Sequence, residues 1–303
     1  MKKRFGVALA LTLATSAFGT VGAQDMSEHL KELVSLSRAL ALSDKPDFAK
    51  RADVLAAYKK NFAQDFSQQA LKKYTDDELA ALFAANSQTG FIALEPRFAR
   101  NMEKLLWELH SRKKSKSDQF EELYRSFIRV RDFESANKMV ADQLVTPMST
   151  LPLFKPSPLV RDDVPSEWSI SKTERVAELR AVDLSKDWQV IVVSHPLCHF
   201  SRRAMLEIYA DKELLQRLKN RAKWIAPQDG NFEFDLTQKW NRDFPELEIS
   251  VVHLRLSWPI PNFRETPVFY FLANGKVVNS FSGWPKEGNM TKLIAGLNSV
   301  SKF

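Results

Sequence analysis

Apolar residues recur at helical spacing through the first half of the chain. Phe98, Met102, Leu105, Leu106 and Leu109 fall on one face of a helix, because residues three and four positions apart lie above one another in this conformation. Polar residues fill most of the positions between them, as in a helix with one face toward a core. A second set has the same spacing: Phe120, Leu123, Tyr124, Phe127 and Ile128. The pattern predicts helices throughout residues 26–144.

Capping and turn signals divide this first half into separate helices. Thr75–Asp76–Asp77–Glu78 has the spacing of a capping box at the start of a helix. Polar breaks at 43–46 and 113–117 predict six or seven helices joined as hairpins. The stretch Phe133–Glu134–Ser135–Ala136–Asn137 loosely resembles tetratricopeptide-type helical repeats, although no clean repeat period runs through the sequence. An all-helical bundle and a repeat-like domain are therefore both open for residues 24–144.

The pattern changes at Val145. Several prolines follow, and each disfavours helix at the residue before it, so residues 145–167 are predicted to form a proline-rich linker. From Trp168 onward strands and helices alternate, and the β-branched run at 190–193 suits a strand buried on both faces. Four further elements are expected: a helix over 202–219 with a break near Asp211, a strand over 223–226, a helix over 234–242 and a strand over 249–254.

Asn274–Gly275 marks a hairpin between two apolar runs. Val268 to Leu272 precede it and Val277–Val278 follow, and Asn-Gly is among the strongest short-range hairpin signals. A closing helix is expected over 286–300. The resulting order β-α-β-α-β-β-α predicts a mixed sheet with helices on both faces. The fold class is therefore multidomain α + α/β, with an N-terminal helical domain and a three-layer α/β/α domain over residues 168–303.

The first residues have the features of a signal peptide. Lys2, Lys3 and Arg4 form a positive segment, an apolar stretch over 5–18 follows, and Val21–Gly22–Ala23 supplies small residues for cleavage after Ala23. We therefore expect residues 1–23 to be removed on export, most simply to a bacterial periplasm. No later segment approaches the roughly 20 apolar residues of a membrane helix, so stable membrane insertion is not expected.

Charge and cysteine usage narrow the candidate chemistry. The chain has a net charge of +7, of which the predicted signal peptide carries three positives, and no basic stripe with interleaved aromatic residues suggests nucleic acid as a partner. Exported proteins usually pair their cysteines. Cys198 is the one cysteine of the chain and cannot close an internal disulfide. It is either a buried apolar residue or a thiol that meets partners from outside.

Two stretches carry a resemblance to the thioredoxin-like fold family. VIVVSHPLCHFS, residues 190–201, is similar to the strand–turn–helix of the family's Cys-x-x-Cys motif, with Cys198 at the first cysteine. ETPVFYFLANGKVV, residues 265–278, is similar to the Thr-Pro and hairpin that follow, with Pro267 at the family's cis-proline. Gly283 falls where the family usually has a glycine. The resemblance implies a thioredoxin-like domain over 168–303 and substrate contacts at Thr266 and Pro267.

The same resemblance shows departures at the cysteine motif. Ser201 replaces the second cysteine, so a mixed disulfide at Cys198 has no internal thiol to resolve it, and a full dithiol cycle is not expected. Ser201 either hydrogen-bonds the thiolate or caps the helix. A thiolate at a helix N-terminus has a lowered pKa, and protonated His199 would act in the same direction. Val192 stands where many thioredoxins bury a carboxylate, and Leu197 replaces a common tryptophan.

Three functions follow from these residues. In the first, Cys198 forms mixed disulfides with a client protein or a small thiol such as glutathione, as a monothiol oxidoreductase without a cofactor; pairing of two copies through Cys198 into a homodimer is open. In the second, the domain is a non-catalytic interaction module. In the third, His195, Cys198, His199 and His253 bind copper or zinc, although we expect His253 to lie at the surface.

Overall fold

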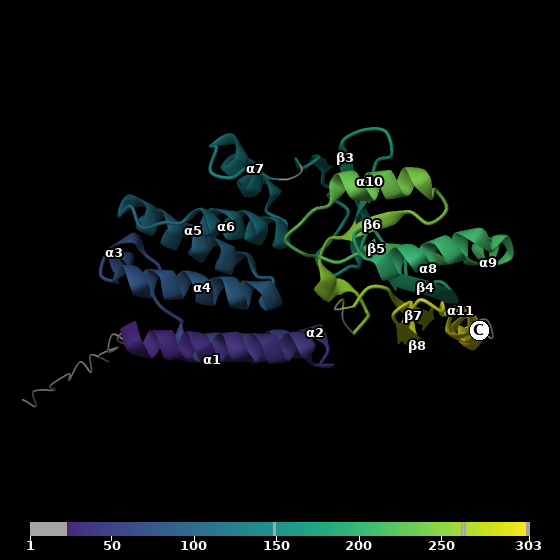
Figure 1. Cartoon of the computed structure of the whole chain (residues 1–303), viewed down its shortest axis with the longest axis horizontal. Helices are drawn as coiled ribbons and strands as arrows, with labels where there is room; N and C mark the ends of the chain where they lie inside the picture. Colours follow the sequence, from purple (N-terminus) through teal and green to yellow (C-terminus); the bar gives the residue numbers. More distant parts are fainter. Residues whose placement is uncertain (1–22, 148–149, 262, 264, 301–303) are drawn as a thin grey trace, which may run out of the picture.

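The structure is a computed structural model that describes residues 23–147, 150–261, 263 and 265–300. The predicted signal peptide, apart from Ala23, lies outside the described residues. Within the described ranges, no helix combines the length and the apolar character needed to cross a membrane. Figure 1 shows two parts side by side: helices drawn in purple to teal, and a sheet with its own helices drawn in teal to yellow.

The first part, the helical half, is built of α-helices up to residue 141. Among the described residues it has seven: α1 (Ala23–Leu42), α2 (Asp47–Asn61), α3 (Gln68–Leu71), α4 (Asp76–Ala93), α5 (Pro96–Ser111), α6 (Ser117–Arg129) and α7 (Phe133–Ala141). The apolar faces predicted for α5 and α6 are buried, which confirms the helical pattern. The capping box at Thr75 is also confirmed, because Thr75 and Glu78 each accept the backbone N–H of the other.

The helices of this half are stacked as hairpins. α1 packs on α2, α4 on α5 and α6 on α7, while α4 also contacts α1 and α6. Gly90 of α4 lies against α5, where a Cβ at this position would come 3.1 Å from the Cβ of Phe98. The first helix of each hairpin thus touches the first helix of the next, in a row that ends at α7.

The second part, the sheet half, contains one sheet of eight strands within the described residues. They are β1 (Leu153–Lys155), β2 (Ser166–Ile170), β3 (Val176–Ala181), β4 (Trp188–Val193), β5 (Ala222–Ala226), β6 (Ile249–Val252), β7 (Val268–Ala273) and β8 (Lys276–Ser282). Its helices are α8 (His199–Ala210), α9 (Lys212–Leu218), α10 (Phe234–Asp243) and α11 (Met290–Val300), and a short 3-10 turn, η1, spans Arg255–Ser257.

The sheet is mixed, as predicted, with the strand order β1-β3-β2-β6-β5-β4-β7-β8. β4, β5 and β6 run parallel, and β7 runs antiparallel to β4 and to β8. Asn274 and Gly275 both have positive φ, at 48° and 75°, as a tight hairpin turn requires. The predicted break at Asp211 is confirmed: this residue ends α8 and caps α9 by accepting the Leu214 N–H.

The helices of the sheet half lie on one face of the sheet, and the prediction of helices on both faces is wrong. The buried side chains of α8, α9, α10 and α11 belong to one cluster with Val190 and Val192, whereas Ile191 and Val193 belong to another. Winding direction explains this. The chain moves from β4 to β5 to β6 in one direction across the sheet, and right-handed crossovers in one direction place their helices on the same side.

A loop covers the other face. After β6 the chain returns to β7 across β5 and β4, and this crossing loop, residues 253–267, places Trp258, Ile260 and Phe263 against Ile191 and Val193. The first part of the loop includes η1. Its described residues contain no helix longer than this single turn, so an irregular stretch takes the place that the expected second helix layer would have filled.

The expected linker, residues 145–167, is also corrected, because it contains β1 and the first residues of β2. β1 is a short edge strand, where flanking prolines are tolerated, and it pairs with β3. Phe154 of β1 stacks on Phe133 of α7, with ring centroids 3.6 Å apart, and contacts Trp168 and Phe232. This aromatic cluster joins the two halves, so the segment is part of the packed structure.

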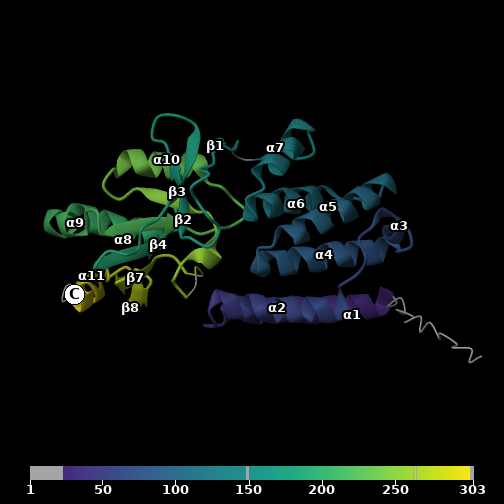
Figure 2. The same ribbon diagram turned by 180° about the vertical axis from the view of Figure 1, so that it is seen from behind.

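The residues that follow β5 and β6 contact the helical half, which lies beside the sheet half in the view from behind (Figure 2). Arg131, just after α6, donates hydrogen bonds to the carbonyl oxygens of Val252 and His253. Desolvation lowers its pKa to about 10, against an opposing effect of Asp229. Arg255 of η1 donates to the Ile92 carbonyl at 3.1 Å. The loops that leave these strands are therefore held by the helices.

Candidate functional site

Cys198 lies at the start of a helix at the end of a central strand. β4 ends at Val193, the turn 194–197 follows, and Cys198 is the N-cap residue of α8. Its backbone N–H donates to the His195 carbonyl at 2.9 Å, and its own carbonyl accepts the Arg202 N–H at 3.0 Å. The side chain is half-buried. The thiol thus has the position at a helix N-terminus that the sequence predicted, with part of its surface open.

Thr266 and Pro267 lie beside this cysteine. The antiparallel pairing of β4 with β7 sets Val193 opposite Val268, which brings the residues before β7 to the cysteine turn. The Cys198 thiol donates to the Thr266 carbonyl, with Sγ 3.1 Å from the oxygen. The Thr266–Pro267 bond is cis, as predicted. Gly283, with φ of 81°, donates its N–H to the Pro267 carbonyl at 2.8 Å.

The surroundings of Cys198 favour the thiolate. Burial raises the pKa of the thiol, and the bond that the thiol donates to the Thr266 carbonyl also favours the protonated form. The Thr266 side chain, Ser201 and the Phe200 backbone lower the pKa by more, so that it lies below its ordinary value. Backbone N–H groups of the first helical turn are unpaired within a helix and are free to stabilise an anion. The site therefore increases the fraction of the nucleophilic form at neutral pH.

Ser201 contributes from a buried position. It lies inside the first turn of α8, while Cys198 takes the N-cap position. Ser201 is therefore not the cap of the helix, one of the two roles that the sequence left open. Its Oγ accepts the backbone N–H of His195 at 3.4 Å, and its N–H and hydroxyl both lower the Cys198 pKa. Ser201 thus favours the thiolate form of Cys198.

The histidines are not gathered into one site. His199 is exposed and its ring lies against Phe200, with centroids 3.9 Å apart. His253 is half-buried rather than fully at the surface as expected: its Nδ1 accepts the Trp168 indole N–H at 3.1 Å. Burial, and then the charge of Arg131, lower the His253 pKa to about 4. In the described part of the chain, no group of three His, Cys, Asp or Glu side chains is arranged to hold a metal ion.

His195 has a partner that the sequence did not indicate. Its Nε2 lies 3.5 Å from Oδ2 of Asp229, which follows β5. Burial raises the pKa of the nearby Glu233, and Asp229 adds to this effect while His195 opposes it. Asp229–Gly230 had the composition of a turn, but the adjacency of β4 and β5 in the sheet was needed to bring this turn to the cysteine turn.

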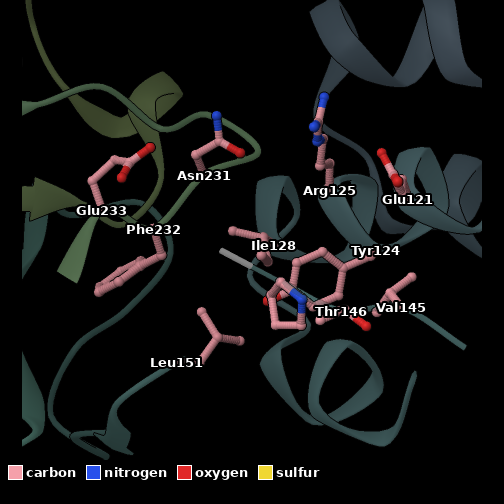
Figure 3. A pocket seen from close by; sticks show the side chains of 11 residues that line it. Glu121, Tyr124, Arg125, Ile128, Val145, Thr146, Leu151, Asn231, Phe232 and Glu233 are labelled. Atoms are coloured by element: carbon pink, nitrogen blue, oxygen red, sulfur yellow. The ribbon is translucent and has the colours of Figure 1, made fainter. Parts of the chain in front are cut away.

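A pocket of about 300 Å³ opens where the two halves meet. Figure 3 shows Asn231 and Glu233 on one side of it, from the loop after β5, and Glu121 and Arg125 of α6 on the other. Tyr124, Ile128, Leu151 and Phe232 supply its apolar surface. The loop 227–233 therefore lines this pocket with one end and meets His195 with the other.

Comparisons with known families, with curated proteins and with solved structures found no match to this chain.

Proposed function

We propose that this protein is an exported, thioredoxin-like protein that exchanges disulfides through a single thiol. The observation that carries the proposal is the geometry of Cys198: a half-buried cysteine at a helix N-terminus, with Sγ 3.1 Å from the Thr266 carbonyl oxygen and a thiol pKa below its ordinary value. A buried apolar cysteine in a structural role would have its pKa raised instead.

The arrangement around the site supports the family resemblance. β4 leads through the cysteine turn to α8, and a cis-proline precedes the hairpin β7–β8, which is followed by α11. The single helix layer and the crossing loop over the other face depart from the three-layer form expected of the family. The stacked hairpins of the helical half agree with the repeat-like alternative, and we propose that this half positions the client.

In the proposed reaction the Cys198 thiolate attacks one sulfur of a client disulfide, R–S–S–R′. The bond between Cys198 and R–S forms as the S–S bond of the client breaks, and R′–S⁻ leaves and takes a proton from water. A low-molecular-weight thiolate of the glutathione type then attacks the mixed disulfide and displaces Cys198 as its thiolate. The number of disulfides does not change, so the cycle needs no further oxidant or reductant.

The client backbone has a defined place to bind. An extended peptide can pair with the backbone at Thr266 as an added strand, which is a common mode of peptide recognition. Because Ser201 cannot resolve the mixed disulfide, release depends on the external thiol. Loss of that thiol should therefore trap the client on Cys198.

Incubation with oxidised glutathione tests this proposal. We expect the reduced mature protein to form one glutathione adduct, seen by intact mass spectrometry, at a rate that reaches half its maximum below about pH 8.5. Cys198→Ser should form none, and Ser201→Ala should shift the midpoint to higher pH. A thiol that titrates above the free value, or a Cys198→Ser variant that keeps the full biological role, would favour the interaction module instead.

A further inference from the structure

His195 organises the turn that carries the reactive thiol. Three of its groups bond within residues 195–201: its carbonyl accepts the Cys198 N–H at 2.9 Å, its N–H donates to the Ser201 Oγ at 3.4 Å, and its ring Nδ1 accepts the Leu197 N–H at 3.2 Å. The ring bond spans two residues, like the side-chain bond of an Asx turn. The conformation of the turn thus depends on a side chain and not on the backbone alone.

The hydrogen bond from Leu197 determines which nitrogen of the His195 ring carries the proton. Because Nδ1 accepts a hydrogen bond, the proton of the imidazole is on Nε2. This nitrogen faces the Asp229 carboxylate at 3.5 Å. Asp229 is itself oriented, since its Oδ1 accepts the Asn231 N–H at 2.9 Å. A carboxylate, an imidazole and a backbone N–H therefore form one chain, which ends next to Cys198.

Other charged groups surround this chain. Glu233 on the same loop as Asp229 interacts with His195, and Arg129 and Arg131 at the end of α6 interact with Asp229. On its own turn, His195 is followed by the Cys198 thiol and by the exposed His199. The Asp229 carboxylate thus interacts both with the cationic residues at the end of α6 and with the imidazole.

The loop that bears Asp229 is seated on the helical half. Gln228 donates through Nε2 to the Arg129 carbonyl at 2.8 Å. Gly230 lies so close to α6 that an added Cβ would come 3.0 Å from the Arg125 Cβ and 3.1 Å from its carbonyl oxygen. A displacement of α6 therefore moves Asp229 directly.

We propose that His195 is a positioning residue that holds the Cys198 turn in its reactive conformation, and that Asp229 fixes the His195 ring from the loop seated on α6. The inference rests on the proposed function and adds a second role for the helical half, which sets the reactivity of the thiol through Asp229 and His195. His195 acts through the conformation of the turn and does not itself contact the sulfur atoms that exchange.

The test measures the rate of Cys198 alkylation by iodoacetamide between pH 5 and 10, in the mature full-length protein. His195→Ala removes the acceptor for Leu197, and we expect a higher pH midpoint with a rate at pH 7 about 3- to 10-fold lower, as a shift of half to one pKa unit implies. His195→Asn keeps an acceptor at the Asx-turn position but cannot reach Asp229, and it should change the rate less than His195→Ala.

Asp229→Asn supplies the decisive comparison, since it keeps the Oδ1 acceptor for Asn231. We expect it to slow alkylation about two- to threefold in the native sequence and not at all in the His195→Asn background. Equal effects in the two backgrounds, or an unchanged midpoint in His195→Ala, would overturn the proposal. Circular dichroism confirms the fold of each variant. Alkylation requires no disulfide partner, so this result is separate from whether the glutathione adduct of the proposed function forms.

Discussion

The two faces of the central strands are covered in different ways. On one face, α8, α9, α10 and α11 pack against alternate residues of β4 to β7, in a core that continues into the helical half. On the other face, the crossing loop supplies Trp258, Ile260 and Phe263, which pack on a smaller cluster around Ile191 and Val193. One face is stabilised by a layer of regular structure, and the other by three large side chains of one irregular segment.

The difference matters because the same crossing loop ends beside Cys198, at the candidate site. Its last residues, Thr266 and Pro267, form the backbone that faces Cys198. Its middle is held by the helical half, where Asp47 donates its N–H to the Pro261 carbonyl at 3.1 Å. On the loop-covered face, one segment therefore both packs the sheet and positions the backbone beside Cys198. On the helix-covered face, we expect the packing to have no such link to the thiol. Substitutions in the helix layer and in the crossing loop should therefore differ in whether they change the reactivity of Cys198 as well as the stability of the fold.

The largest expected effects come from removing one buried tryptophan from the crossing loop and one from the helix layer. Trp258→Ala in the crossing loop and Trp240→Ala in α10 both remove a buried indole, and each should lower the free energy of unfolding by about 3 to 5 kcal/mol in urea titrations. We expect Trp258→Ala also to raise the pH midpoint of Cys198 alkylation, because the loop that positions Thr266 loses one of the three large side chains that pack it on the sheet.

Trp240→Ala is the matched control. It should leave the alkylation midpoint unchanged, since α10 packs on β2 and β6, away from the cysteine turn. If both variants shift the midpoint equally, the shift reflects general loosening, and the distinction between the two faces fails.

Acid should act on the start of the crossing loop. The His253 pKa is lowered to about 4 by burial and the Arg131 charge, below the ordinary value of about 6.5. Between about pH 6.5 and pH 4, His253 is therefore protonated in the unfolded chain but not in the folded chain. The free energy of unfolding accordingly decreases as the pH falls through this range. After allowance for partial exposure, this contributes roughly 2 kcal/mol.

His253→Asn isolates this contribution, because asparagine keeps an acceptor for the Trp168 indole N–H but does not titrate. Unfolding free energies at pH 7 and pH 4.5 should differ less in the variant than in the native protein. If the free energy of unfolding decreases equally with falling pH in the native protein and in the variant, another group causes the acid sensitivity.

The smallest expected effect concerns the brace between the halves. The Asp47 carboxylate lies 3.3 Å from Arg255 Nε, and both side chains are largely buried. Burial lowers the pKa of Arg255 and Asp47 opposes this. Asp47→Asn should cost about 1 to 2 kcal/mol of unfolding free energy, measured by urea denaturation, because the largely buried Arg255 guanidinium loses its ion-pair partner. Lys45→Ala, which removes an exposed ion pair with Asp53, is the control and should be nearly neutral.

The sequence predicted those elements whose signals are local. The apolar stripes of α5 and α6, the capping box at Thr75 and the Asn274–Gly275 turn depend on neighbours a few residues away, and they were confirmed. The hairpin β2–β3 and the strand β1 were missed, because Phe154 gains its partners from α7 and β2 and prolines surround it. The order of strands, which placed all four helices on one face, is set by long-range pairing that no short stretch encodes.

Within the candidate site, too, features with local signals were predicted and features that depend on long-range contacts were not. The position of Cys198 at a helix N-terminus and the cis bond at Pro267 followed from motifs. The partner of His195 did not, because Asp229 lies more than thirty residues later and meets it through the adjacency of β4 and β5. The burial of His253 was missed for a similar reason: it depends on Trp168 and Arg131, which come from two other parts of the chain.

Arg131 has a consequence for any attempt to divide the protein. Its guanidinium satisfies carbonyl oxygens at the end of β6, so a fragment that starts after the helices would expose those oxygens and lose the aromatic contacts of Phe133. A fragment that stops at residue 144 would in turn leave the Arg131 guanidinium without these acceptors and keep only one ring, Phe133, of the aromatic cluster. The two halves should therefore denature in a single transition. A chimaera that takes one half from a related chain should fold only if the residues that contact Arg131 and Phe133 come from that same chain.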